Sequence, residues 1–375
     1  VSANATVLKI VGTNAEITGS GTTQITVNQL ESANYLAGSI LVAVTIAKNA
    51  PTLVLSDISK TYGDAAFTVA ASTNSNGAIS YSSSNTSVAT ISGNTVTIVG
   101  AGTATITASQ VEYHDYTAAT TTATLTVARL GQQINITGLP ATQPLKDFSS
   151  IAITATSSAG LPVTLSLQDG SAATLTGGVG NYSLTSIGAT GSVTIVASQV
   201  GNTNYLPISL TVSFDVVKSN QTLAADSVAA TTYASSLVIP IVSSASSGLP
   251  VSMFVESGPG NITDGNKLNV TGAGTIVIHI DQMGNEAWNR APFIHVHVTI
   301  NKANPTIVGL SDVTKTYGDP PFTLNASSNS TGAISYSSSN TAVATINSST
   351  GAITLVGPGT VTFTLSQAAS GNYLA

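Results

Sequence analysis

Apolar and polar residues alternate along short segments of this chain. Clear examples are Val42–Ile46, Ile276–Ile280 and Val296–Ile300, in which every second residue is Val or Ile. Because successive side chains of a strand point to opposite faces, this pattern predicts half-buried β-strands. Gly, Pro, Asn and Ser separate the segments at intervals of roughly 8–12 residues, which is typical of a β-sandwich or barrel. No segment has the period of a helix over a useful length.

The alternating segments belong to a longer repeat. One loop aromatic precedes the last strand expected in each copy, at spacings of 81 to 89 residues: Tyr35, Tyr116, Tyr205, Trp288 and Tyr373. Such a period predicts a tandem array in which each copy is one folded unit. The predicted units are 1–48, the C-terminal part of a repeat; 49–129; 130–218; 219–302; and 303–375, which lacks its last strand.

The repeats are of two kinds. Units 49–129 and 303–375 share the sequences Lys-Thr-Tyr-Gly-Asp and Gly-Ala-Ile-Ser-Tyr-Ser-Ser-Ser-Asn, whereas units 130–218 and 219–302 share Gly-Leu-Pro-Val. Both ends of the chain fall out of register with the units. Half a sandwich would expose an unpaired edge and half a core, so we expect the chain to be a window of a longer array.

The composition fits folded sandwiches and excludes several classes of protein. Hydrophobic residues make up 42% of the 375 residues and the formal net charge is -6, which argues against disorder. The ten Lys and Arg residues are scattered, so no nucleic-acid partner is expected. There is no cysteine, which excludes disulfides and thiolate metal sites. Apolar runs fall far short of the ~18 residues of a membrane-spanning helix, and we expect no membrane span.

Two runs carry a resemblance to a known family. The run Tyr81–Ile91 reads Tyr-Ser-Ser-Ser-Asn-Thr-Ser-Val-Ala-Thr-Ile, and Val96–Thr107 continues with Val-Thr-Ile-Val-Gly-Ala-Gly-Thr-Ala-Thr-Ile-Thr. Together they resemble the bacterial Ig-like group 2 repeat, and the Lys-Thr-Tyr-Gly-Asp segments are similar to related repeats of very large surface proteins. The mixture resembles the repeat regions of giant cell-surface adhesins, including the mobile adhesins of gliding bacteria. This likeness extends over essentially the whole chain.

The resemblance and the pattern together give one expectation for fold and function. The expected fold is all-β, a tandem array of Ig-like β-sandwich domains. The resemblance implies an extracellular place on a bacterial cell surface and a structural stalk that projects a distal binding region, in adhesion and gliding motility. The implied partners are neighbouring repeats of the same longer chain, with surface polysaccharide or substratum contacted by regions outside these residues. The alternative is a carbohydrate- or ligand-binding module that uses the face or loops of 219–302.

The sequence offers no set of residues for catalysis. No Gly-x-Ser-x-Gly elbow stands between a strand and a helix, and no carboxylate pair suits glycoside hydrolysis. The Gly-x-Gly-Thr turns precede strands, so they are interpreted as tight turns and not as phosphate-binding loops. The loop aromatics are interpreted as packing residues, with Trp288 the best candidate for stacking on a sugar. We therefore predict no enzyme, no cofactor and no catalytic or cofactor-binding residue.

The histidines of one repeat allow two interpretations, a zinc site or an exposed polar face without metal. His279, His295 and His297 lie in unit 219–302, on the polar face opposite Ile276, Ile278 and Ile280. If the connecting loop is centred near Trp288, His279 lies beside His297, with Asp281 on the same face, and such a group could hold zinc. The favoured interpretation is an exposed polar face without metal, because other repeats carry Thr107, Val196 and Thr364 at the position of His279. No metal ligand is therefore assigned.

Calcium is the other cation considered. Asp57, Asp64, Asp312 and Asp319 recur in the units of the first kind. Calcium sites need several clustered oxygen ligands, and these residues are spread out. We interpret them as turn residues.

Overall fold

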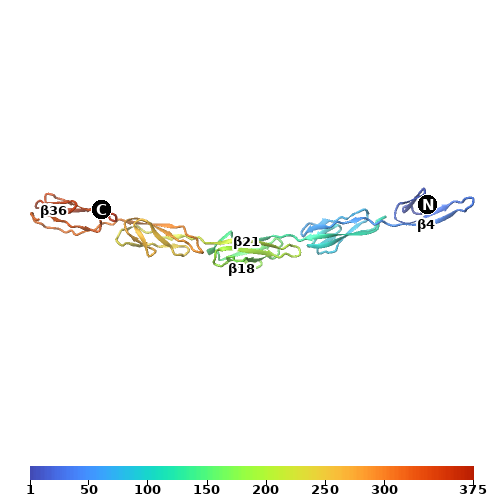
Figure 1. The fold of residues 1–375 in the computed structure, drawn as a ribbon, viewed down its shortest axis with the longest axis horizontal. Coiled ribbons are helices and arrows are strands. Elements are labelled where there is room, and N and C mark those ends of the chain that lie inside the picture. The colour runs from blue at the N-terminus through green and yellow to red at the C-terminus, as the bar shows by residue number, and fades with distance from the viewer. The chain divides into compact units, whose positions relative to one another are not determined.

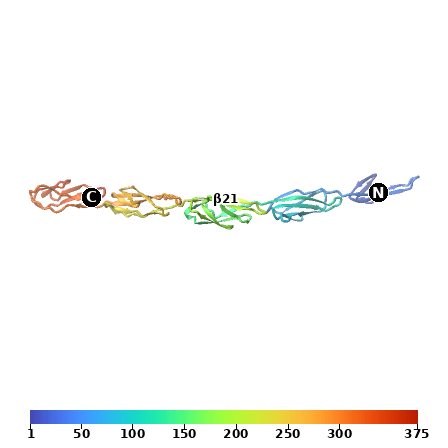
Figure 2. The same ribbon diagram turned by 60° about the horizontal axis from the view of Figure 1, so that its bottom comes forward.

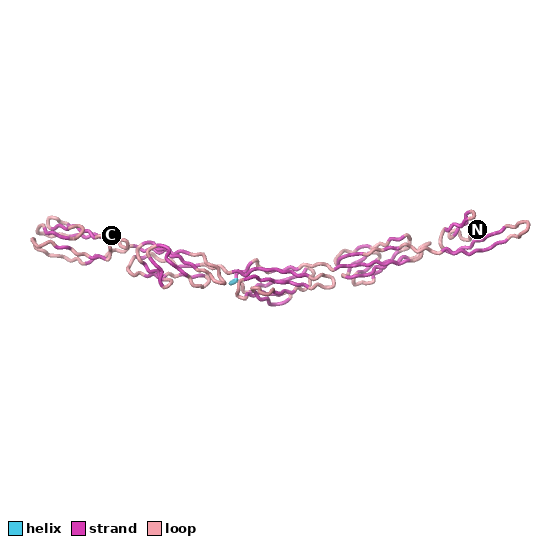
Figure 3. The backbone as a smooth tube through the Cα atoms, in the orientation of Figure 1, coloured by secondary structure: helices cyan, strands magenta, loops and turns pink.

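The computed structural model describes residues 1–375. It consists of short β-strands and loops, with one turn of 3₁₀ helix, η1 (Leu145–Asp147), coloured cyan in Figure 3. No helix combines the length and the hydropathy required to span a membrane. The chain is therefore all-β.

The segment 49–129 is a two-sheet sandwich. Its strands are β5 (Leu53–Val54), β6 (Ile58–Thr61), β7 (Phe67–Thr68), β8 (Ser72–Thr73), β9 (Ile79–Ser83), β10 (Ala89–Ser92), β11 (Thr95–Ile98), β12 (Gly102–Gln110) and β13 (Ala119–Ala128). One sheet has the order β6-β13-β12-β9, and the other side consists of β10-β11-β7 and the pair β5-β8.

The segment 130–218 has the same plan, with longer strands in one of its two sheets. They are β14 (Ile134–Thr137), β15 (Thr142–Pro144), β16 (Ser150–Ser157), β17 (Thr164–Leu167), β18 (Ala173–Gly178), β19 (Asn181–Ser186), β20 (Gly191–Gln199) and β21 (Ile208–Val217). Two four-stranded sheets have the orders β14-β16-β19-β18 and β15-β21-β20-β17. Figure 1 labels β18 and β21, one strand from each sheet.

The segment 219–302, yellow in Figure 2, repeats the arrangement. Its strands are β22 (Leu223–Ala225), β23 (Thr231–Thr232), β24 (Val238–Pro240), β25 (Ser243–Ala245), β26 (Ser252–Ser257), β27 (Gly260–Thr263), β28 (Lys267–Val270), β29 (Gly274–Asp281) and β30 (Ile294–Asn301). The order β23-β30-β29-β26 forms one sheet, and β24-β28-β27 and β22-β25 form the other side.

The first and last segments have fewer strands. Residues 1–48 contain β1 (Leu8–Val11), β2 (Asn14–Ile17), β3 (Gly21–Gln29) and β4 (Gly38–Ile46). Residues 303–375 contain β31 (Ile307–Val308), β32 (Phe322–Thr323), β33 (Ser327–Ser328), β34 (Ile334–Ser338), β35 (Ala344–Ile346), β36 (Ala352–Leu355) and β37 (Phe363–Gln367). Their pairings are β1-β2 and β3-β4, and then β31-β33, β32-β36-β35 and β34-β37.

The strand order identifies the sandwiches as Ig-like. Ig domains place their first, second, fifth and fourth strands in one sheet and their third, sixth and seventh in the other. In 130–218 this corresponds to β14-β16-β19-β18 and to β17, β20 and β21, with β15 added in parallel beside the last strand. The fold is a tandem array of Ig-like β-sandwich domains. The predicted boundaries between domains remain a prediction.

The alternating pattern decides which side chains form the cores. Ile276, Ile278 and Ile280 of β29 are fully buried, and the residues between them face outward. They pack against alternate residues of β30, from Val296 to Ile300, in a continuous cluster. The predicted inward face is therefore confirmed. Burying one such aliphatic side chain stabilises a domain by about 2 kcal/mol.

Residue contacts divide the chain into two compact units. The first contains Val1–Leu139, Ser150–Thr185 and Val193–Ser213, and the second contains Pro140–Ser149, Ser186–Ser192 and Phe214–Ala375. Within each unit, residues of neighbouring predicted repeats contact one another.

Candidate functional site

The three histidines of 219–302 lie on one outer sheet face, but their pairing differs from the prediction. His279 lies opposite His295, and His297 lies opposite Val277. The predicted pair His279–His297 is wrong by two residues. The prediction centred the loop on Trp288, whereas Trp288 closes a tight turn in which its carbonyl oxygen accepts a hydrogen bond from Asn285 N at 3.0 Å. The observed pairs are centred on Ala287, one residue earlier than predicted, and this moves each partner by two residues.

Two histidines and one glutamate bring their polar atoms together. The distance from His279 Nδ1 to His295 Nε2 is 3.3 Å, and the distance from His295 Nε2 to Glu256 Oε2 is 2.8 Å. One ligand atom from each of these three residues lies within 4.8 Å of the others. His297 is exposed and does not belong to this cluster.

Two phenylalanine rings hold His279 between them. The imidazole stacks on Phe254 at 4.9 Å between ring centroids and on Phe293 at 4.7 Å. Both phenylalanines are 54% exposed, so they contribute little to the core. Their position restricts the plane of the imidazole ring.

Asp281, predicted to join the histidines, is used elsewhere. Its carboxylate pairs with Arg290 through both oxygens, and its Oδ1 also accepts a hydrogen bond from Gln282 N at 2.7 Å. The Arg290 guanidinium holds the pKa of Asp281 below its ordinary value. Arg290 therefore neutralises this carboxylate, and Glu256 supplies the acidic group of the cluster.

Glu256 was missed at the sequence level because it lies on β26, which is far from the histidines in the sequence although it pairs with β29 in the sheet. It falls in an irregularity of β26, where the pairing with β29 shifts between Val255 and Ser257. A bulge of this kind redirects side chains and cannot be located from alternation alone. The only sequence signal was the outward position of Phe254 and Glu256, two residues apart.

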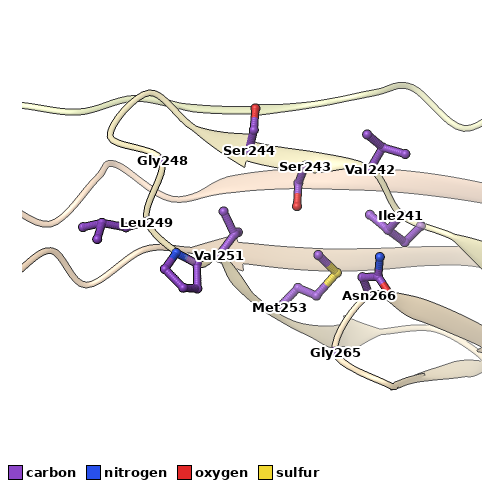
Figure 4. Close-up of a pocket in the computed structure, with 11 residues that line it drawn as sticks. Ile241, Val242, Ser243, Ser244, Gly248, Leu249, Val251, Met253, Gly265 and Asn266 are labelled. Carbon is purple, nitrogen blue, oxygen red and sulfur yellow. The ribbon is translucent and has the colours of Figure 1, made fainter.

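A surface cavity of about 430 Å³ lies elsewhere in the same repeat (Figure 4). It is lined by residues from the ends and connections of β24, β25, β26 and β27–β28: Ile241, Val242, Ser243, Leu249, Val251 and Met253 among them. The lining contains the Gly-Leu-Pro-Val sequence of the second repeat kind. No charged side chain lines it, so it suits an apolar group better than an ionic one.

The Gly-x-Gly turns act as strand connections, as predicted. Gly102 begins β12 with φ +142°, and a Cβ there would meet Val88 Cγ2 at 2.9 Å. The N–H of Ala101, between the two glycines, is not free to bind a phosphate. It donates instead to a side-chain oxygen of the next repeat.

This hydrogen bond recurs at three repeat junctions. The acceptor is the residue just before the loop aromatic, and the donor is the middle residue of the preceding turn: Asp115 with Ser20 N, Asn204 with Ala101 N at 2.9 Å, and Asn372 with Ala273 N at 2.9 Å. Each pair lies within one compact unit. We call this contact the junction hydrogen bond. The fourth junction has Ala287 at the acceptor position, and there Lys146 N donates to Ser219 Oγ at 2.9 Å.

The linkers are bound to the repeats that they enter. At four junctions the linker residue forms a parallel β-bridge with the loop aromatic: Asn49 with Tyr116, Leu130 with Tyr205, Ser219 with Trp288 and Ala303 with Tyr373. Each bridge comprises two backbone hydrogen bonds of 2.7–3.0 Å. Each linker residue is thereby fixed to the repeat that it enters.

The loop tyrosines pack against tyrosines of the preceding repeat. Tyr205 meets Tyr62 edge-on at 5.5 Å between ring centroids, and Tyr373 meets Tyr233 in the same way at 5.9 Å. Such edge-to-face pairs contribute about 1 kcal/mol beyond the burial of area. At these two junctions the aromatic is a packing residue.

Asp115 should make its junction sensitive to acid. The hydrogen bond from Ser20 N lowers the pKa of Asp115 below its ordinary value of 3.8. A lowered pKa stabilises the folded state at neutral pH, and this contribution disappears as the pH falls through the folded value. In NMR, we expect the Ser20 amide shift to titrate with a midpoint below 3.8. Asp115→Asn should abolish this titration, and the Ala101 amide, bonded to Asn204, should not move. A midpoint above 3.8 would contradict the hydrogen bond.

A recurrent glutamine, buried in four of the five predicted repeats, escaped the sequence analysis. Gln110 donates from Nε2 to the carbonyl oxygens of Ser75 and Gly77 at 3.0 and 2.9 Å, and Gln367 makes the equivalent bonds at 3.2 and 2.9 Å. The signal was present as a glutamine eight residues after the second glycine of each turn: Gln29, Gln110, Gln199, Gln282 and Gln367.

Part of the last predicted repeat matches a known family model. Residues 323–369 match the family model described as "Intimin, immunoglobulin-like domain". The match supports an adhesin-type Ig-like repeat in this part of the chain. No curated protein matches the chain in sequence.

Solved structures of multidomain proteins are similar at low identity. Drosophila N-cadherin EC1-4 is 10% identical, with a TM-score of 0.26, over 75% of this chain and 83% of that chain. Sidekick-1 immunoglobulin domains 1-5 are 12% identical, with a TM-score of 0.24, over 79% and 70%. Surface layer protein SbsC domains 4-9 are 15% identical, with a TM-score of 0.22, over 99% and 69%. These TM-scores carry no argument about function.

Proposed function

We propose that this chain is a load-bearing stalk segment of an extracellular, adhesin-type surface protein. The observation that carries the proposal is the parallel pairing of an N-terminal strand with the last strand in each of three repeats: β6 with β13, β15 with β21, and β23 with β30. When a chain is pulled from both ends, paired parallel strands slide past each other. All their hydrogen bonds then resist the load together instead of opening one by one.

The junctions support the same role. The linker bridges pass the load directly into the next repeat, and the junction hydrogen bonds join a turn to the following loop. A quasi-linear array lengthens by adding such units. In this proposal the role is non-enzymatic, on a bacterial cell surface, and the distal binding region lies outside these residues. A part in gliding motility rests on the sequence resemblance and would be tested by deleting the repeats in the source bacterium.

Single-molecule stretching tests the proposal. Because the chain has no cysteine, terminal cysteine handles attach uniquely. We expect separate unfolding events, each adding about 280 Å of extended chain less the length of the folded repeat, for an 81-residue repeat. Smooth extension without such events would contradict a load-bearing role.

The alternative function is a ligand-binding module in 219–302. The 430 Å³ cavity and the exposed Phe254 and Phe293 favour it. A glycan array probed with the full chain distinguishes the two functions. Dose-dependent binding that is lost in Phe254→Ser would support the alternative, whereas absence of binding is expected of a stalk.

A further inference from the structure

One outer sheet face of repeat 219–302 differs from the same face in repeat 49–129. His279 is paired on one side with Phe254 and on the other with His295. In repeat 49–129 the corresponding paired positions hold small hydroxyl residues: Thr107, Ser82 and Thr122. Hydroxyl side chains therefore suffice for an exposed face of this sheet, and the rings of 219–302 need another explanation.

The spacing of the two histidine nitrogens matches that of two metal ligands. Zinc binds imidazole nitrogen at about 2.05 Å, so two ligands of a tetrahedral site lie about 3.3 Å apart. The Nδ1 of His279 and the Nε2 of His295 are 3.3 Å apart, and the Glu256 carboxylate lies 2.8 Å from the same Nε2. Small side-chain rotations would place all three atoms around one ion.

Two partners in the cluster compete for one ring nitrogen of His295. His295 Nε2 lies within hydrogen-bonding distance of both Glu256 and His279, yet a ring nitrogen carries at most one hydrogen. If that hydrogen is donated to Glu256, the Nδ1 of His279 shares it or loses its partner. A cation between the three groups satisfies each of them.

The surroundings hold the ligands in place and leave them accessible. Phe254 and Phe293 sandwich the His279 ring, and an apolar shell of this kind is common around metal ligands. The competing cation, Arg290, is held by Asp281. Glu256 and His295 are both partly exposed, so an ion can enter from solvent.

We propose that Glu256, His279 and His295 bind one Zn²⁺ ion on the outer face of β26, β29 and β30. Two imidazoles and one carboxylate form a recognised zinc ligand set that leaves the fourth position to water. The ion links three adjacent strands and so stabilises repeat 219–302 specifically. This inference does not depend on the stalk function.

Calorimetric titration of the full chain with Zn²⁺ in metal-free buffer tests the site. We expect one equivalent to bind with a Kd of micromolar or tighter. His279→Ala, His295→Ala and Glu256→Gln should each weaken binding at least tenfold. His297→Ala is the matched control, since it removes an exposed histidine from the same strand face, and it should leave the Kd unchanged. Binding weaker than micromolar, or equal loss in His297→Ala, would overturn the proposal.

A second readout guards against misfolded variants. Trp288 is the only tryptophan and lies in the loop that joins β29 and β30, so its fluorescence reports unfolding of this repeat. Zn²⁺ should raise the urea midpoint of the wild type and of His297→Ala, but not that of His295→Ala. An unchanged wild-type midpoint at saturating Zn²⁺ would count against the site.

Discussion

Gln110→Leu should destabilise repeat 49–129 by about 3 kcal/mol, because it removes three hydrogen bonds from a buried side chain. Gln110 is 2% exposed. Its Nε2 donates to Ser75 and Gly77, and its Oε1 accepts from Thr73 Oγ1 at 2.8 Å. Leucine has a similar volume and leaves those partners without a replacement. The glutamine thus holds the loop between β8 and β9 against the end of β12.

Hydrogen exchange with peptide resolution, on the full chain, measures this effect in one repeat at a time. Protection should fall throughout 49–129, while 303–375, with Gln367 intact, serves as the internal reference. Gln29→Leu is the matched control, since Gln29 has the same place in its repeat but is exposed. A loss of folding free energy below about 1 kcal/mol, which is what a single hydrogen bond contributes, would show that the loop does not depend on Gln110.

Gly77→Ala should also destabilise repeat 49–129, by about 3 kcal/mol, the upper range for forcing an atom into a packed site. An added Cβ would lie 2.2 Å from the carbonyl oxygen of Val111. This oxygen belongs to the backbone and cannot move away without breaking the pairing nearby, where Val111 N donates to Ala78 O at 3.1 Å. The shared Gly-Ala-Ile-Ser-Tyr sequence therefore begins with glycine for steric reasons.

Urea unfolding followed by circular dichroism, together with hydrogen exchange, checks this expectation. Gly131→Ala is the control, because its Cβ would meet nothing within 4 Å, and it should change stability little. Gly332 occupies the equivalent place in the last repeat, with Ala368 O at 1.8 Å from the added Cβ, so Gly332→Ala should act in the same direction. If Gly77→Ala and Gly131→Ala lowered the stability equally, the close approach of residue 77 to the Val111 carbonyl oxygen would be refuted.

Turn chemistry was predicted correctly for two of the four aspartates interpreted as turn residues, whereas Asp57 accepts its hydrogen bond from Thr124 N at 2.7 Å, on a strand far away in the sequence. Asp64 and Asp319 accept hydrogen bonds from Thr61 N and Thr316 N at 2.9 and 3.0 Å, three residues earlier in the chain. Interactions of this range depend on local spacing alone. The buried glutamines were readable in principle from their recurrence, but their burial depends on loops that approach from 33 to 35 residues away.

The sequence by itself determined the all-β class, the repeat and the inward face of strands such as Ile276–Ile280, because alternation and recurrence are local properties of the chain. Only the tertiary structure decided that His279 faces His295 and not His297, that Glu256 joins them, and that Asp281 is taken by Arg290. The register of β29 with β30 and the irregularity at Glu256 decide those neighbours. A register difference of two residues changes every cross-strand pair but leaves each side chain on the same face, so the alternating pattern cannot detect it.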